Sequence, residues 1–118
     1  MSGTGKYVDV PKYINDDDEV AVLYSPGYGS GWSTWNDNPA ILFDIKLVMW
    51  VLEGKPSNQL KSLEEYVKTA YDEDHIYVGS NLPSLKIRWV PYNTRFIMTE
   101  YDGSEEVVLE KEMNWIIA

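Results

Sequence analysis

Short apolar runs bounded by turn residues mark the start of the chain, and this pattern predicts strands. Residues 20–24 form an unbroken apolar run that ends at a Ser-Pro-Gly turn, which is typical of a buried central strand. Residues 7–10 alternate between apolar and polar, and Pro11 limits them to a strand end or a sheet edge. Residues 1–6 lack this patterning, and we expect them to form a flexible N-terminal arm.

A longer apolar run at residues 40–53 predicts the first helix, and Gly54 is a natural stop for it. Nearly every position is apolar, and the charged residues Asp44 and Lys46 within the run lie on roughly opposite sides. A helix that is apolar all round must be covered on more than one face. It is therefore either central to the fold or part of a subunit interface, and we expect a homo-oligomer formed through residues 40–52.

The second half of the chain begins with an amphipathic pattern at residues 58–72, which predicts an ordinary surface helix. Asp102-Gly103 is a strong signal for a β-hairpin turn. The remaining periodicity predicts strands at residues 75–78, 85–89, 95–101 and 105–110.

These elements follow the order ββααββββ, which predicts an α+β fold. We expect a mostly antiparallel sheet of five to six strands, with two helices inserted after the second strand. No internal repeat, low-complexity tract or linker divides the sequence. Residues 7–118 are accordingly predicted to form a single α+β domain.

The balance of charge narrows the classes of partner. Nineteen acidic residues stand against ten basic ones, which makes the formal net charge −9. Such a field repels phosphates, so direct binding of nucleic acid or an anionic membrane is disfavoured, whereas a basic protein could be attracted. The apolar run at residues 41–52 is too short and too interrupted by charge to span a membrane. We expect a soluble, intracellular protein.

Few residue types suited to metal binding or catalysis are present. There is no cysteine, which excludes disulfides and thiolate metal sites, and His75 is the sole histidine. The acidic segment at residues 15–19 lacks the ligand spacing of an EF-hand loop. No spacing in the sequence indicates a pair of carboxylates suited to general acid–base catalysis. We expect no catalytic residue, no metal and no cofactor, although a hydrolase is not excluded.

An aromatic and glycine-rich loop at residues 25–36, SPGYGSGWSTWN, is the strongest candidate for a binding site. Its glycines would let the backbone approach a ligand closely, and its aromatic rings could stack on a flat ligand. Its hydroxyls and amide could form hydrogen bonds to the same ligand. The alternative is a structural loop whose rings cover one end of the core. The glycine spacing matches neither the dinucleotide fingerprint nor a P-loop. The candidate ligand-binding residues of this loop are Tyr28, Gly29, Ser30, Gly31, Trp32, Ser33, Thr34, Trp35 and Asn36.

The two arginines of the chain, Arg88 and Arg95, fall in adjacent predicted strands. Guanidinium groups bind phosphate oxygens in a bidentate manner, so a pair on one face of a sheet would suit a nucleotide ligand. The alternative is that each arginine forms an ion pair with one of the many acids. Strand order decides whether the two arginines and the aromatic loop share one pocket.

Two segments carry a resemblance to known proteins: the loop at residues 25–36, and the stretch from Trp89-Val90-Pro91 to Glu100-Tyr101-Asp102-Gly103. Together they resemble a group of small, mostly uncharacterised bacteriophage proteins, over about residues 8–108. The resemblance implies a phage accessory protein in the cytoplasm of the bacterial host. It carries no established chemistry onto individual residues.

Accessory proteins of this kind often counter host defence, and three hypotheses follow. The first is a non-enzymatic protein that binds and sequesters a small nucleotide-like immune signal, with the loop stacking on it and the arginines holding phosphates. The second is an acidic inhibitor that blocks a basic host defence protein by direct binding. The third is a small hydrolase of the same nucleotide signals.

Overall fold

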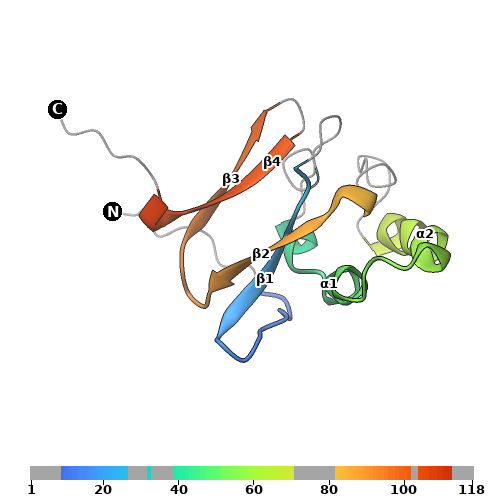
Figure 1. Ribbon diagram of the computed structural model, residues 1–118, viewed down its shortest axis with the longest axis horizontal. Coiled ribbons are helices and arrows are strands. Elements are labelled where there is room, and N and C mark those ends of the chain that lie inside the picture. Colours follow the sequence, from blue (N-terminus) through green and yellow to red (C-terminus); the bar gives the residue numbers. More distant parts are fainter. Residues whose placement is uncertain (1–8, 27–31, 33–38, 71–81, 102–103, 113–118) are drawn as a thin grey trace.

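The computed structural model describes residues 9–26, 32, 39–70, 82–101 and 104–112, and it has an α+β fold (Figure 1). The elements are β1 (Glu19–Tyr24), η1 (Pro39–Phe43), α1 (Ile45–Leu52), η2 (Ser57–Gln59), α2 (Leu60–Ala70), η4 (Leu82–Ser84), β2 (Lys86–Pro91), β3 (Phe96–Tyr101), β4 (Ser104–Leu109) and η5 (Glu110–Glu112). The described helices and strands follow the order β1, α1, α2, β2, β3, β4, with short 3-10 turns between them, so the strand predicted before β1 is not among them.

The described strands form two antiparallel sheets of two strands each, and not the expected single sheet of five to six. β1 pairs with β2 from Glu19 opposite Pro91 to Tyr24 opposite Lys86. β3 pairs with β4 from Phe96 opposite Leu109 to Tyr101 opposite Ser104. Residues 9–10 are not in a strand, and the predicted strand at residues 75–78 lies outside the described residues.

The turn between β2 and β3 connects the two sheets. Tyr92 donates its N–H to the carbonyl of Asp18, 2.9 Å away, at the end of the β1–β2 ladder. Asn93 then takes a left-handed conformation with φ 66°, and Thr94 N–H donates to Pro91 O at 3.0 Å. After this turn the chain enters β3, which pairs with β4 and not with β2.

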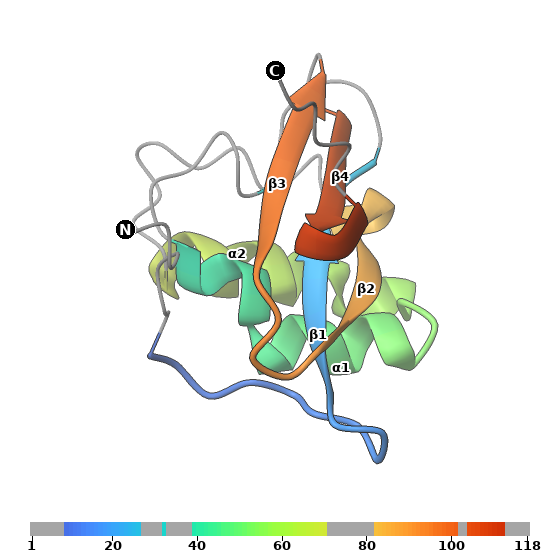
Figure 2. The ribbon, with the colours of Figure 1, turned by 90° about the vertical axis from the view of Figure 1, so that its left-hand side faces the viewer.

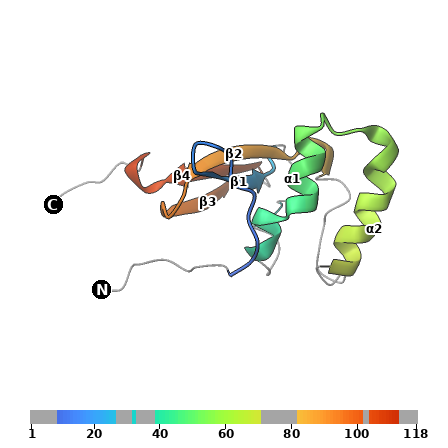
Figure 3. The ribbon, with the colours of Figure 1, turned by 90° about the horizontal axis from the view of Figure 1, so that it is seen from below.

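β1 lies at the centre of the fold, as its unbroken apolar run predicts. Successive side chains of a strand point to opposite faces. Ala21 and Leu23 belong to a cluster with the helices, whereas Val20 and Val22 belong to a second cluster with β4 and η1. Figure 3 shows the same order of layers, with α2, α1, the β1–β2 sheet and the β3–β4 hairpin in sequence. Both faces of β1 are thus covered.

The first helix begins later than residue 40, because Asp44 interrupts the apolar run. Asp44 has a non-helical backbone, and its Oδ1 accepts the N–H of Leu47 at 2.9 Å. Satisfying an otherwise unbonded N–H of the first turn is the role of a helix N-cap. The other oxygen, Oδ2, accepts the hydroxyl of Tyr66 on α2 at 2.7 Å. One carboxylate therefore starts α1 and ties it to α2.

Gly54 ends the helix as predicted, with φ 91° just after the C-cap Glu53. This left-handed conformation is one that glycine adopts without steric cost. The second helix covers most of its predicted range and buries Leu63 and Val67, which lie one turn apart on one face.

Candidate functional site

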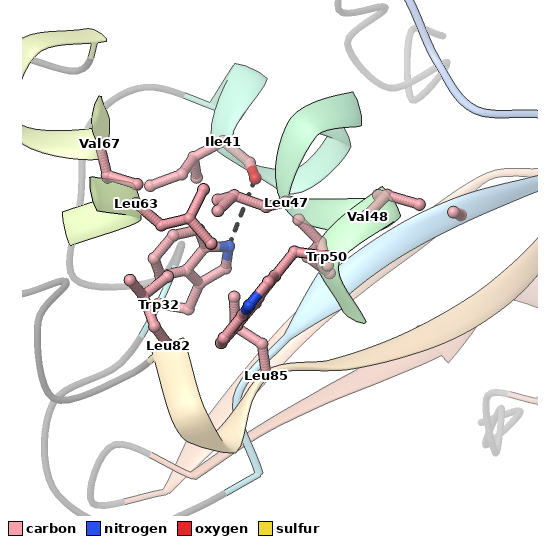
Figure 4. Close-up of a cluster of buried hydrophobic side chains, with 11 residues drawn as sticks. Trp32, Ile41, Leu47, Val48, Trp50, Leu63, Val67, Leu82 and Leu85 are labelled. Carbon is pink, nitrogen blue, oxygen red and sulfur yellow. Dashed lines mark hydrogen bonds between the residues drawn. The ribbon is translucent and has the colours of Figure 1, made fainter. Parts of the chain in front are cut away.

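Trp32 is part of the hydrophobic core and is fully buried. Figure 4 shows its indole among side chains from η1, α1, α2 and η4, including Ile41, Leu63 and Leu82. The indole N–H donates to the carbonyl of Ile41 at 3.3 Å. A ring enclosed in this way has no face left for a ligand, so the expectation that Trp32 stacks on a nucleotide base is wrong. Instead, Trp32 contributes its indole to the core.

The other candidates in the loop lie outside the described residues. They are Tyr28, Gly29, Ser30, Gly31, Ser33, Thr34, Trp35 and Asn36. The expectation that they bind a ligand stays a prediction.

Arg88, on β2, is engaged with acceptors of the chain itself. Its Nη1 donates to the carbonyl of Val107 on β4 at 3.3 Å, and its Nη2 donates to the carboxylate of Glu112 at 2.7 Å. The hydrogen bond from Arg88, followed by one from the N–H of Leu109, holds the pKa of Glu112 below its ordinary value. Arg88 therefore links the two sheets.

Arg95 forms an ion pair with Glu110, and its carbonyl accepts the N–H of the same residue at 3.0 Å. The acceptors Glu110 and Glu112 both belong to η5, so the two arginines converge on one short turn. The structure thus brings the arginines to one end of the fold, but β2 and β3 belong to different sheets, so the two arginines do not lie on one face of a shared sheet as expected. Each arginine forms an ion pair with a glutamate, Arg88 with Glu112 and Arg95 with Glu110, which is the alternative to phosphate binding.

Trp32 and the arginines do not share a site. Trp32 packs with α1, α2 and η4 (Figure 4), whereas the arginine partners lie in η5 at the opposite end of the structure (Figure 1). A pocket built from the indole of Trp32 and both guanidinium groups is therefore excluded by the fold.

Sequence reasoning missed a buried polar cluster where β1 meets β4. Glu105 is only 2% exposed, and its Oε1 accepts the N–H of Ser25 at 3.0 Å. The Oγ atoms of Ser25 and Ser84 are 2.8 Å apart, and Ser104 donates its hydroxyl to Pro26 O at 2.5 Å. The signal was present in the alternation of β4, because Glu105 occupies the same inward face as Val107 and Leu109.

The outer face of the β3–β4 hairpin combines exposed apolar and acidic side chains. Directly paired residues share a face, so Ile97 lies with Val108, Thr99 with Glu106, and Tyr101 with Ser104. Ile97 is 49% exposed and Tyr101 is 77% exposed, and Glu106 is exposed between them. The opposite face packs Phe96 and Met98 against the core. We call this outer face the hairpin face.

No group of three or more potential metal ligands occurs among the described residues. None of the helices in the described part of the chain is both long and apolar enough to cross a membrane. Comparison with protein-family models, with curated proteins and with solved structures found no match.

Proposed function

We propose that this protein acts by binding a basic protein partner through the hairpin face, and thereby blocks that partner. The observation that carries the proposal is the pair Ile97 and Tyr101, two large apolar side chains exposed beside the carboxylate of Glu106. Exposed apolar groups surrounded by charge are typical of surfaces that bind other proteins. Tyrosine is also among the residues that most often dominate binding energy at such surfaces.

The charge of the hairpin segment favours a basic partner. Residues 95–112 contain six acidic residues and two basic ones. Arg95 is ion-paired with Glu110, and Glu112 is ion-paired with Arg88 of β2. The acidic excess speeds the approach of a cationic surface and discriminates against acidic ones. The resemblance to phage proteins makes a host protein with a basic surface the natural class of target.

Sequestration of a nucleotide has less support among the described residues. To bind the phosphates of a nucleotide, Arg88 and Arg95 would have to break their ion pairs with Glu112 and Glu110. The buried indole of Trp32 offers no face on which a base could stack. Catalysis has still less support. Glu105 is a buried carboxylate beside a serine, but its Oε1 already accepts the backbone N–H of Ser25 inside the fold.

The test is capture from bacterial lysate, followed by purification of the captured protein and measurement of its affinity. We expect a basic protein whose complex weakens as salt is raised, since exposed charges are screened. Tyr101→Ala should weaken binding about tenfold or more, as loss of an aromatic anchor does. Tyr92→Ala is the matched control, because Tyr92 is exposed but lies in the turn at the other end of β3.

A second pair of variants tests the charge. Glu106→Lys should weaken binding and slow association, whereas Glu65→Lys, an equal change of charge on α2, should not. The protein should also be mixed with a nucleotide panel and its contents released by heat. Recovery of intact nucleotide would replace this proposal with sequestration, and recovery of altered nucleotide would replace it with hydrolysis. Equal binding by Tyr101→Ala and the wild type would exclude the hairpin face.

A further inference from the structure

Helix α1 carries a second exposed apolar surface. Ile45, Met49 and Leu52 are spaced by four and three residues, so their side chains lie along one stripe. They are 37%, 44% and 46% exposed. The opposite face of the same helix buries Leu47, Val48 and Trp50. The helix is thus apolar toward the core and apolar toward solvent.

Two opposite charges border this stripe. Lys46 and Glu53 are the charged residues of the segment 45–53, and both are exposed. They are seven residues apart, or about two helical turns, so they lie on the same side of the stripe at its two ends. The ammonium of Lys46 lies 4.5 Å from the centre of the Tyr66 ring, which holds it on the side of α1 next to α2.

We propose that this surface binds α1 of a second copy of the chain in an antiparallel, two-fold symmetric pair. A two-fold axis at Met49 places Ile45 of one copy near Leu52 of the other. It also places each Lys46 opposite Glu53 of the second copy, so both ion pairs form at once. In a parallel pair the two-fold axis would put the two Lys46 residues at one level and the two Glu53 residues at another, on opposite flanks of the contact, so no pair of Lys46 with Glu53 would form. The charge pattern is therefore complementary to itself only in the antiparallel arrangement.

The size of the surface sets the strength of the dimer. A helix of eight residues is about 12 Å long. Contact over this length buries less than the roughly 1,200 Å² of a standard stable interface. The dimer should therefore form reversibly, with a dissociation constant of about micromolar or weaker. It can coexist with a partner on the hairpin face, because α1 and β3–β4 pack on opposite faces of β1.

Sedimentation velocity over a wide range of protein concentration tests the proposal. The mass should rise from 13.6 kDa toward twice that value as concentration increases. Lys46→Glu and Glu53→Lys each oppose like charges at two symmetric positions, so either alone should weaken dimerisation at least tenfold. The double variant Lys46→Glu/Glu53→Lys restores both pairs with the charges exchanged and should restore the dimer. Lys111→Glu, on η5, is the control for the change of net charge.

Circular dichroism establishes that each variant is folded before its mass is interpreted. A monomer at every concentration would overturn the proposal. A dimer that persists unchanged in both single charge reversals would also overturn it, because the contact would then lie elsewhere. Failure of the double variant to dimerise would exclude the antiparallel register.

Discussion

Ser25 and Glu105, eighty residues apart in the sequence, are bonded to each other twice. Glu105 donates its N–H to the carbonyl of Ser25 at 2.7 Å, and Ser25 donates its N–H to Oε1 of Glu105 at 3.0 Å. Both residues are buried, so water does not compete for these groups. This double contact attaches the start of β4 to the residue that follows β1. Figure 2 shows the resulting arrangement, with the β3–β4 hairpin extending beyond the end of β1.

Replacing Glu105 tests this attachment. Glu105→Ala removes the acceptor and leaves the buried N–H of Ser25 without it, which should lower the free energy of unfolding by about 1–3 kcal/mol. Glu105→Gln keeps an acceptor oxygen and should cost less. Urea denaturation measures both. Equal losses in the two variants would show that the charge, and not the bond to Ser25, is what matters.

Trp32 provides a prediction that separates packing from ligand binding. Trp32→Ala should lower the free energy of unfolding by about 3–5 kcal/mol, because it empties a large volume in the core. Trp32→Phe should cost less, since most of the ring volume is kept. Tyr92→Ala, at an exposed aromatic residue, should change stability by no more than about 0.5 kcal/mol. A stable Trp32→Ala protein would contradict the burial of the indole.

Asp44 and Tyr66 allow a double-mutant cycle across the two helices. Tyr66→Phe removes the hydrogen bond to Asp44 and should cost about 1 kcal/mol. Asp44→Ala also removes the helix cap, and should cost about 2–4 kcal/mol. Because both changes break the same bond, the double variant should lose less than the two single losses added together. Additive losses would show that the two side chains do not stabilise each other.

Glu112 predicts a pH dependence of known sign. Its pKa is lowered in the folded protein, mainly by the hydrogen bond from Arg88. The carboxylate therefore stabilises the fold above its unfolded pKa, and this contribution is lost as pH falls through the folded pKa. Glu112→Gln should be less stable than the wild type at pH ~7, and the two should converge toward pH ~3. Urea midpoints at both pH values test this, and a constant difference would contradict it.

Local patterns in the sequence were sufficient to predict several of the helices and strands. The apolar run of β1, the amphipathic spacing of α2 and the alternation around Asp102-Gly103 all predicted elements that the structure contains. The resulting α+β class is confirmed. Such patterns succeed because the period of a helix or strand and the residue that ends it depend on neighbours within a few positions.

The start of α1 was placed too early because composition alone does not distinguish two roles of an aspartate. Asp44 looks like a polar interruption within an apolar helix, yet it is the N-cap. Its second oxygen needs Tyr66, and the sequence does not place α2 beside it. The single large sheet was also wrong, since the described strands form two separate pairs, β1 with β2 and β3 with β4, and pairing of this kind depends on contacts between distant parts of the chain.

The sequence by itself determined the acidic charge, the absence of cysteine chemistry, the α+β class with two helices, and the excess of apolar residues on α1. Tertiary structure alone decided that Trp32 belongs to the core and that Arg88 and Arg95 meet carboxylates on η5. The physical reason is that burial and ion pairing depend on residues brought together from distant parts of the chain. An indole or a guanidinium has the same chemistry in a pocket as in a core, and only its neighbours determine which role it has.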